Sequence, residues 1–199
     1  MLYLIGLGLN VKGISLQGLE AIKKCGKIYL ENYTVDFPYE LKDLENSIGK
    51  KIYLAPREFV ENKVNEFLKG AEKENIALLI YGSPLTATTH ISLIQEAEKN
   101  KIKCEIIYGA SIIDAISQTG LQIYKFGKIA SMPKHEAPSF FEIIKDNQKI
   151  HAHSLILVDI GLELNDALKK LGYINKEKIL ICSQLGTENS KIFYGKISN

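Results

Sequence analysis

The segment 82–90, Gly-Ser-Pro-Leu-Thr-Ala-Thr-Thr-His, holds the densest group of side chains that could bind a polar ligand. It carries four hydroxyl groups within seven residues and follows the apolar run 76–81, which indicates a buried strand. Ligands of parallel α/β sheets bind beyond the carboxyl ends of the strands. A turn in which Thr86, Thr88 or Thr89 caps the next helix is the structural alternative. The position of the loop favours a binding role.

A second glycine-containing turn, Gly6-Leu-Gly8, follows the first expected strand. Missing side chains let the backbone approach a ligand, as in dinucleotide-binding loops, and Glu31 ends the next strand where a ribose-binding acid would lie. Val11 stands where the third glycine of that fingerprint belongs. The incomplete pattern favours a simple strand–helix turn over an NAD site.

Other candidates follow later strands. Ser111 and Ile112 could close the other side of the same pocket, with a helix cap as the alternative for Ser111. Tyr124 and Lys125 bring a phenol and an ammonium group near an expected hinge, where either could guide a substrate or assist proton transfer. Surface placement is the alternative for Lys125, and we assign no catalytic residue.

Several reaction classes lose support from the sequence. The four histidines form no ligand set with carboxylates at helical or hairpin spacing, so we expect no metal, although His151 and His153 would share a face of a strand. The three cysteines belong to no Cys-x-x-Cys pair, which suggests a reducing compartment. Neither a Gly-x-Ser-x-Gly elbow nor a P-loop is present.

The composition is that of a folded globular chain. Of 199 residues, 46% are hydrophobic and 24% charged, with a formal net charge of +2. The charges are spread without the basic stripe that nucleic-acid binding requires. The start of the chain lacks a basic signal-peptide region, and no apolar run approaches a membrane span. We expect a cytoplasmic protein that binds neither nucleic acid nor membrane.

Strand and helix patterns alternate in the first hundred residues, which predicts a parallel sheet. Ser15 is the expected N-cap of the first helix, Pro38 opens the second, and Gly49 ends it. The expected strands are 2–5, 27–31, 51–55, 76–81 and 102–108, and the expected helices are 15–25, 38–48, 59–68 and 91–97.

The regular alternation of strands and helices ends after the short helix expected within 109–120. Strands at 128–132, 154–160, 178–183 and 191–197 surround helices at 138–147 and 163–171. The predicted fold is therefore α/β, with a mostly parallel N-terminal domain at 1–110, a hinge at 111–127 and a smaller, shortened mixed α/β domain at 128–199. A cleft between two such domains would be the natural ligand site.

These segments together resemble the diphthine synthases, a family of the tetrapyrrole (precorrin-type) methylase superfamily. Residues 1–9, 18–20 and 29–34 resemble the family's first elements. The blocks 82–90, 110–112 and above all 120–127, Gly-Leu-Gln-Ile-Tyr-Lys-Phe-Gly, resemble family motifs in the right order and spacing. Residues 153–160 and 182–197 resemble the second domain's strands more loosely, so the resemblance spans most of the chain.

The resemblance implies a two-domain methyltransferase with S-adenosylmethionine bound between the domains, no metal, and usually a homodimer. Similar proteins methylate the amino group of 2-(3-amino-3-carboxypropyl)histidine on translation elongation factor 2. Three successive methylations give diphthine, a step of diphthamide biosynthesis. Carried over position by position, the family's cofactor contacts fall on Leu9, Ser83, Thr86, Ser111, Ile112, Val158 and Leu185.

Two departures from the family pattern bear on cofactor affinity. Ser83 stands where the family usually has Asp, and a charge-assisted hydrogen bond is roughly twice as strong as a neutral one. The chain stops at Asn199, whereas relatives continue through further elements that include another cofactor contact, and the stretch 162–177 is short. We expect weaker cofactor binding, a contribution from another chain, or a minimal version of the protein in which the short stretch 162–177 reflects general trimming.

Methyl transfer from a sulfonium to a neutral amine depends on positioning and a dry pocket, which agrees with the few acids and bases found. Two other functions stay open. The chain could be another methylase of the superfamily, with a tetrapyrrole or ribosomal RNA as substrate. It could instead be a non-catalytic module that docks a translation factor.

Overall fold

The computed structural model describes residues 1–172 and 178–196. Its contacts divide the chain into two compact units. The first unit contains Met1–Ala115 together with the short turn Gly186–Glu188, and the second contains Ile116–Leu185 and Asn189–Asn199.

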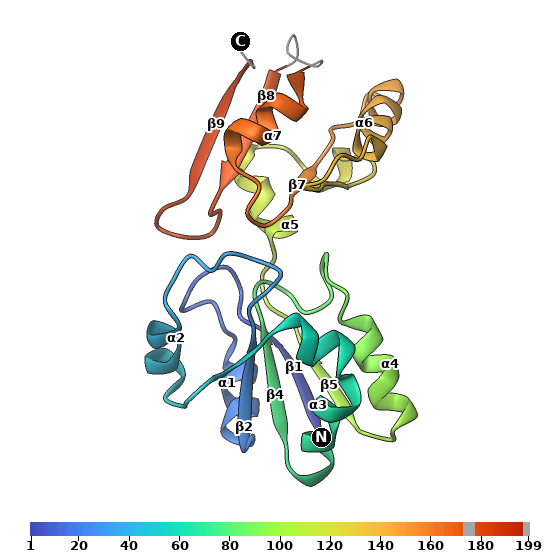
Figure 1. Ribbon diagram of the computed structural model, residues 1–199. Helices are drawn as coiled ribbons and strands as arrows, with labels where there is room; N and C mark the ends of the chain where they lie inside the picture. Colours follow the sequence, from blue (N-terminus) through green and yellow to red (C-terminus); the bar gives the residue numbers. More distant parts are fainter. Residues whose placement is uncertain (173–177, 197–199) are drawn as a thin grey trace. The chain divides into compact units, whose positions relative to one another are not determined.

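A five-stranded sheet in the order β3-β2-β4-β1-β5 forms the centre of the first unit (Figure 1). Every neighbouring pair is parallel, so all five carboxyl ends lie at one edge of the sheet. The parallel sheet predicted from the sequence is thereby confirmed. The strands are β1 (Leu2–Gly6), β2 (Lys27–Glu31), β3 (Tyr53–Ala55), β4 (Ile76–Ile80) and β5 (Cys104–Ile107).

Helices cover both faces of this sheet. Helices α3 and α4 lie on one side of the sheet and α1 and α2 on the other (Figure 1). Alternate residues of β1 enter different cores, because Leu2 and Leu4 pack with α3 and α4 whereas Tyr3 and Ile5 pack with α1 and α2. Burial on both faces explains why the strand sequences are continuously apolar. The helices are α1 (Leu16–Lys23), α2 (Leu41–Ile48), α3 (Val64–Lys73), α4 (Ile91–Lys99) and α5 (Ile112–Ala115).

The helix signals in the sequence are confirmed in part. The Ser15 side chain accepts a hydrogen bond from the Gly18 amide, and Gly49 ends α2 in the left-handed conformation at φ 73°. The expected opening of α2 at Pro38 is wrong, because Glu40 is still extended. The helix expected at 59–68 is interrupted, because a π-helical turn at Glu58–Asn62 precedes α3 and Lys63 leaves helical geometry between them.

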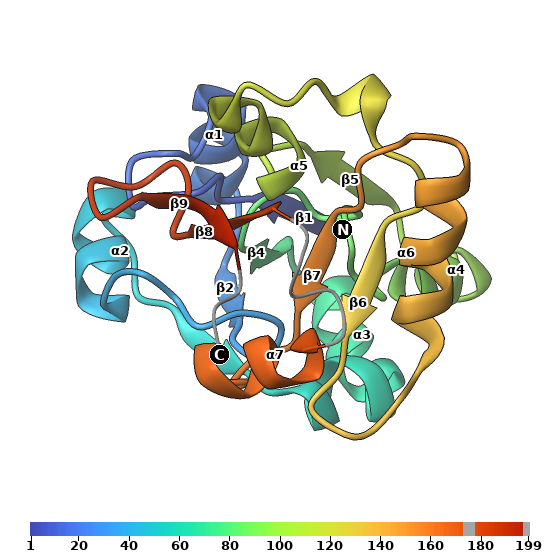
Figure 2. The same ribbon diagram turned by 90° about the horizontal axis from the view of Figure 1, so that it is seen from above.

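The second unit combines two small sheets. The pair β6–β7 is parallel and packs with α6 and Ala167 of α7, while β8–β9 is an antiparallel hairpin (Figure 2). This is the mixed α/β architecture expected for this part, with a 3-10 turn at Ile123–Lys125 before the first strand. The elements are β6 (Ala130–Met132), α6 (Ser139–Lys149), β7 (Ile156–Val158), α7 (Leu164–Lys170), β8 (Lys178–Ser183) and β9 (Lys191–Lys196).

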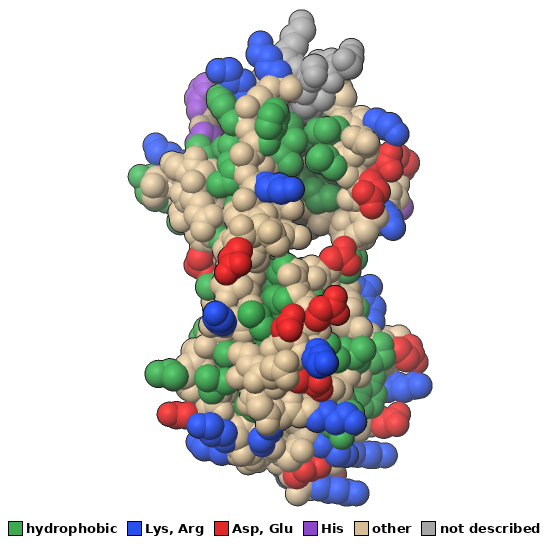
Figure 3. Space-filling model, turned by 90° about the vertical axis from the view of Figure 1, so that its left-hand side faces the viewer, with side chains coloured by type: hydrophobic (Ala, Val, Ile, Leu, Met, Phe, Trp, Pro, Cys, Tyr) green, Lys and Arg blue, Asp and Glu red, His purple; other side chains and the backbone are tan. Residues whose placement is uncertain are grey.

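Two of the segments discussed in the sequence include residues that the structure does not describe. Ile197, the expected end of the last strand, and residues 173–177 of the short stretch lie outside the described residues. Within the described ranges, no helix has the length and apolar character needed to cross a bilayer. Acidic and basic side chains are interspersed on the face drawn in Figure 3.

A single lysine fastens the end of α1. The Nζ atom of Lys50 donates hydrogen bonds to the carbonyl oxygens of Ile22, Lys23 and Cys25 at 3.0, 3.2 and 2.9 Å. These carbonyls lie at the carboxyl end of the helix, where a positive charge also interacts favourably with the helix dipole. Lys50 therefore ties the loop before β3 to the helix that follows β1.

We expect Lys50→Met to lower the free energy of unfolding by about 1–2 kcal/mol, because the substitution keeps the aliphatic stem and removes the charged donor. Urea titration of the full chain measures the change. The control is Lys42→Met on exposed α2 surface, where the loss should be within about 0.5 kcal/mol. Equal stabilities of the two variants would show that Lys50 does not fasten the helix end.

Candidate functional site

The loops after β1, β4 and β5 meet at the carboxyl edge of the sheet through glycine residues. The amide of Gly8 donates to the Gly82 oxygen at 3.1 Å, and the Gly82 amide donates back to the Gly8 oxygen at 2.9 Å. A Cβ atom on Gly6 would lie 2.6 Å from both the Gly82 oxygen and the Gly109 nitrogen. Gly8 and Gly82 have φ values of 67° and 73°. We call these four residues the glycine junction.

The junction explains Gly6-Leu-Gly8 without a dinucleotide. Gly6 leaves space for two neighbouring loops, and Gly8 supplies a left-handed turn. Glu31, the expected ribose-binding acid, is fully buried and accepts hydrogen bonds from the Tyr33 amide, the Thr34 amide and the Thr34 hydroxyl. The carboxylate thus organises the turn after β2, and the strand–helix turn is the better interpretation.

The loop 82–90 starts at this junction and carries two of the predicted cofactor residues. Ser83 is buried, and its carbonyl accepts from the amide of half-buried Thr86 at 3.1 Å. The Thr88 hydroxyl donates to the Pro84 oxygen at 2.6 Å. The expected alternative role of a threonine as the cap of α4 is wrong, because His90 occupies the N-cap position and makes no side-chain cap.

Ser111 and Ile112 follow β5 on the opposite side of β1 from this loop. Ser111 is buried, its hydroxyl accepts from the Ile113 amide at 3.2 Å, and its own amide donates to the Asp114 carboxylate at 2.6 Å. This reciprocal pair caps the short helix α5, as the alternative for Ser111 anticipated. Half-buried Ile112 is the first residue of α5.

Leu9 lies just beyond the junction and is buried. Its carbonyl accepts a hydrogen bond from the Tyr81 hydroxyl at 2.8 Å, and its side chain packs so closely on Gly186 that a Cβ there would lie 2.7 Å from Cδ1. The Asn10 amide group also donates to the Gly186 oxygen at 2.9 Å. The turn Gly186–Glu188 is thereby held against the loop after β1.

The seven predicted cofactor residues divide between the two units. Five of them lie on three loops at one sheet edge of the first unit: Leu9, Ser83, Thr86, Ser111 and Ile112. Leu185 and Val158 belong to the second unit. Leu185 immediately precedes Gly186 in the chain and is buried, whereas Val158 ends β7 with 51% of its surface exposed.

The remaining sequence candidates lie in the second unit. Tyr124 is 76% exposed, and the Lys125 Nζ is 5.9 Å from its ring centroid. His151 and His153 do not share a strand face as expected, because His151 adopts φ 55° in a turn and β7 begins only at Ile156. Among the residues that the structure describes, no group of His, Cys, Asp and Glu is arranged to hold a metal ion.

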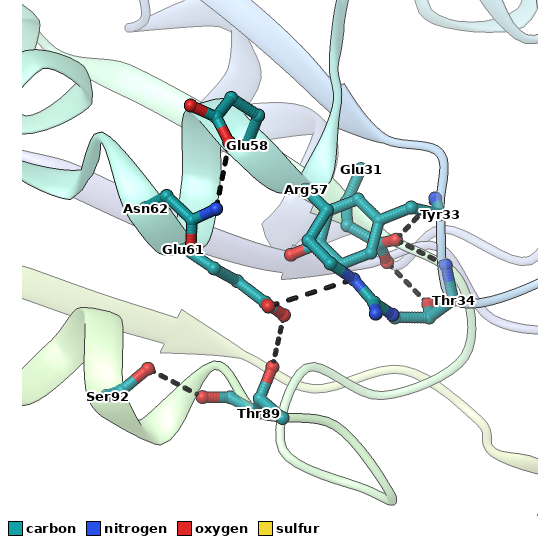
Figure 4. Close-up of polar contacts among 9 residues, drawn as sticks. All are labelled: Glu31, Tyr33, Thr34, Arg57, Glu58, Glu61, Asn62, Thr89 and Ser92. Carbon is teal, nitrogen blue, oxygen red and sulfur yellow. Dashed lines mark hydrogen bonds and ion pairs between the residues drawn. The ribbon is translucent and has the colours of Figure 1, made fainter.

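A second polar group lies at the same sheet edge, beyond β2, β3 and β4. It comprises Glu31, Tyr33, Arg57, Glu61, Thr89 and His90, and we call it the edge cluster. The Glu61 carboxylate accepts the Thr89 hydroxyl at 2.7 Å and lies 3.7 Å from Arg57 Nε, while the Arg57 guanidinium covers the Tyr33 ring at 5.1 Å (Figure 4).

His90 forms the buried base of the edge cluster, with 1% of its surface exposed. Burial lowers the pKa of the ring, and this effect is opposed by the Glu31 carboxylate, the Pro84 carbonyl and the Glu61 carboxylate. Neither ring nitrogen has a partner in hydrogen-bond geometry within 1–172 and 178–196. The Tyr33 hydroxyl faces Glu61 but also lacks such a partner there, and its pKa is raised, chiefly by burial.

Sequence reasoning missed Tyr81, Glu61 and the role of His90. Tyr81 could have been found, because it directly precedes the Gly82 turn. Glu61 and Arg57 carried no local signal, since only the fold brings the turn after β3 beside the loop after β4.

The low pKa of His90 predicts a pH-dependent stability. The unfolded chain takes up a proton near the ordinary pKa of 6.5, whereas the folded chain resists protonation, so the free energy of unfolding should fall as pH drops below about 6.5. His90→Gln should remove this component and show a flatter profile between about pH 7.5 and pH 5 in urea titrations. Exposed His135→Gln should keep the wild-type slope; equal slopes for both variants would contradict the assignment.

Comparison with known proteins identifies the family. The model for tetrapyrrole (corrin/porphyrin) methylases matches residues 1–199. The diphthine methyl ester synthase of Saccharomyces cerevisiae is 45% identical over 169 residues, which cover 82% of this chain and 56% of that protein. The corresponding protein of Candida glabrata is 43% identical over 169 residues, which cover 82% of this chain and 57% of that protein.

The fold agrees with a solved structure of the same kind. A crystal structure of diphthine synthase matches with a TM-score of 0.93 at 30% sequence identity, covering 98% of this chain and 82% of the other. The chain spans little more than half the length of the curated relatives, at 56% and 57%. From the family model, the sequence identities and the fold, the chain belongs to the tetrapyrrole (corrin/porphyrin) methylase family.

Proposed function

We propose that the protein is an S-adenosylmethionine-dependent methyltransferase that acts on the amino group of 2-(3-amino-3-carboxypropyl)histidine in translation elongation factor 2. One observation supports the proposal most. Five of the seven residues that the family resemblance names as cofactor contacts follow three adjacent strands around the glycine junction. They lie at the edge where parallel α/β sheets bind ligands. Cytoplasmic location and a homodimer are parts of the same proposal.

The cofactor site would use loop backbone and small polar groups. Ser83, Thr86 and Ser111 offer hydroxyl groups, and Leu9 and Ile112 offer apolar contacts for an adenine or ribose. Val158 and Leu185, the other two positions that the resemblance names, belong to the second unit. The bound cofactor supplies the methyl group on a sulfonium. The residues bind and orient it and keep water away, which is most of what an in-line displacement requires.

The name of the curated relatives suggests a fourth methyl group. A diphthine methyl ester carries a methyl on a carboxyl oxygen in addition to the three on nitrogen. Our proposal from the resemblance is the three amino-group methylations that give diphthine. The two products differ in mass by one methyl group, and alkali removes only the ester.

A direct assay tests the activity. The protein is incubated with radiolabelled S-adenosylmethionine and elongation factor 2 that bears the precursor histidine. The factor is then digested, and the mass of the labelled peptide is measured by mass spectrometry before and after alkaline treatment. We expect label in the factor, with three methyl groups stable to alkali. A fourth, alkali-labile group would extend the product to the methyl ester. Label only in ribosomal RNA or in a corrinoid would favour another methylase of the superfamily.

Cofactor affinity tests the site separately from the reaction. Because Asp at position 83 would supply a charged acceptor, Ser83→Asp should tighten S-adenosylmethionine binding by roughly 1–2 kcal/mol, about five- to thirtyfold, in calorimetric titrations. Ser92→Asp, on the exposed first turn of α4, is the matched control and should leave the affinity unchanged.

Three other results would argue against part of the proposal. Unchanged affinity with an unchanged melting temperature would remove Ser83 from the cofactor contacts. A lower melting temperature without tighter binding would mean that the new carboxylate is buried without a partner. No heat from the wild-type protein at millimolar cofactor, with elongation factor 2 still bound, would favour the docking module over the enzyme.

A further inference from the structure

The edge cluster has an open rim above a buried base. Thr89 is exposed, Arg57 has 61% of its side chain exposed and Glu61 has 28%. Beneath them lie Glu31 and His90, which are almost fully buried. The cluster is formed within the first unit alone, by the turns after β2 and β3 and the end of the loop after β4. Figure 4 shows its members other than His90. The exposed residues form the side from which a ligand would approach the buried ones.

The charges of the cluster favour a cation in its interior. The charged groups that act on the Tyr33 hydroxyl and the His90 ring are the carboxylates of Glu31 and Glu61 and the guanidinium of Arg57. Two carboxylates against one guanidinium leave one negative charge. The neighbouring Glu58 has its own partners in Asn62 and Lys63, so it does not alter this balance.

Two polar side chains point to an occupant. Buried polar groups in proteins nearly always have hydrogen-bond partners, because leaving one without a partner costs free energy. Within 1–172 and 178–196, the ring nitrogens of His90 and the hydroxyl of Tyr33 have no partner in full hydrogen-bond geometry; the ring faces the Pro84 carbonyl and the hydroxyl faces the Glu61 carboxylate. A neutral imidazole offers one acceptor nitrogen, and the two carboxylates offer further acceptors, so the cluster suits a group rich in N–H donors.

The chemistry of the rim refines the ligand class. An aliphatic amino group supplies such donors, and its protonated form also balances the negative charge. Because methyl transfer needs the neutral amine, a bound ammonium first releases its proton to solvent. Arg57 could bind a carboxylate next to that ammonium, because its 3.7 Å contact with Glu61 is too long for a hydrogen bond and its side chain is largely exposed. The matching ligand is the head group of an α-amino acid, with ammonium and carboxylate on one carbon.

Two reactants of the proposed function carry such a head group, namely the cofactor and the modified histidine. The strand order β3-β2-β4-β1-β5 separates them. The predicted cofactor residues of the first unit lie beyond β4, β1 and β5, whereas the edge cluster lies beyond β3, β2 and the far end of the loop after β4. The cluster is therefore beside the predicted cofactor site and does not coincide with it.

We propose that the edge cluster binds the amino-acid head group of the methyl acceptor, with its amino nitrogen between Glu31, Glu61 and His90 and its carboxylate at Arg57. This inference rests on the proposed function. It places the nitrogen that receives the methyl group on the opposite side of the loop 82–90 from Ser111 and Ile112.

Calorimetry of the full chain tests the proposal with three titrants. S-adenosylmethionine is the first. The others, added to protein saturated with the demethylated cofactor product, are 2-(3-amino-3-carboxypropyl)histidine with its histidine α-amino and α-carboxyl groups blocked as amides, and its analogue, the same compound without the amino group on the propyl chain. We expect Glu61→Gln and His90→Gln to weaken binding of the amino compound about tenfold, the scale of one charge-assisted hydrogen bond. Binding of the analogue and of S-adenosylmethionine should change less than about twofold by the same reasoning.

Arg57→Gln should weaken both acceptor compounds, since both keep the carboxylate. The matched controls are Glu66→Gln on exposed α3 surface and exposed His135→Gln, which should bind all titrants as the wild type does. Glu31 is left unchanged, because its three hydrogen bonds hold the turn after β2. If His90→Gln fails to fold, Glu61→Gln and Arg57→Gln decide the test.

The outcomes distinguish this inference from the proposed function. Folded variants that bind the amino compound as tightly as the wild type would overturn the inference, as would a wild-type protein that binds S-adenosylmethionine but not the acceptor. Variants that weaken S-adenosylmethionine by the same factor would assign the cluster to the cofactor and also overturn it. A wild-type protein that binds no S-adenosylmethionine would instead refute the proposed function.

Discussion

The close approach of three backbone segments at the glycine junction is the constraint on which the candidate site depends. The loops after β1, β4 and β5 can meet only if positions 6 and 109 lack a Cβ, which would lie 2.6 Å from the Gly82 oxygen in either case. The paired hydrogen bonds between Gly8 and Gly82 then fix the start of the loop 82–90. Without this contact, Ser83 and Leu9 would have no defined distance from each other.

The sheet beneath the junction supplies the rigidity that such a contact needs. Alternate residues of β1 and β4 are buried against different helix pairs, so neither strand can shift by one residue without exchanging its two cores. Strand register therefore fixes where each loop begins. The polar residues can lie on loops, and still be well placed, because the strands that carry the loops cannot move.

Local patterns predicted the fold well and the site only in part. The alternation of apolar strands and striped helices gave the parallel sheet, and Ser15 and Gly49 marked helix ends because capping depends on adjacent residues. Pro38 and the helix expected at 59–68 misled, since Glu40 and Lys63 adopt backbone conformations that hydrophobic spacing does not report.

The edge cluster shows why the remainder could not be predicted. Glu31, Glu61 and His90 are about thirty residues apart along the chain, and each has an ordinary local explanation as a strand end, a helical residue or a loop residue. The fold brings β2, β3 and β4 side by side, and only then do the two carboxylates lie near the imidazole of His90. The spacing of Gly6 and Gly8 likewise suggested a dinucleotide site. A glycine that makes room for a ligand and a glycine that makes room for a neighbouring loop look the same in the sequence.

The loop 82–90 joins the two halves of the sheet edge, and this has a consequence for the proposed chemistry. In methyl transfer from sulfur to nitrogen, positive charge leaves the cofactor side and develops on the acceptor nitrogen. Negative charge near that nitrogen stabilises the transition state more than the neutral amine, which is the condition for faster chemistry. Ser83, at the start of the loop, is neutral, whereas the far end of the loop lies beside Glu31 and Glu61. The distribution of charge along this loop therefore follows the direction in which charge moves during the reaction.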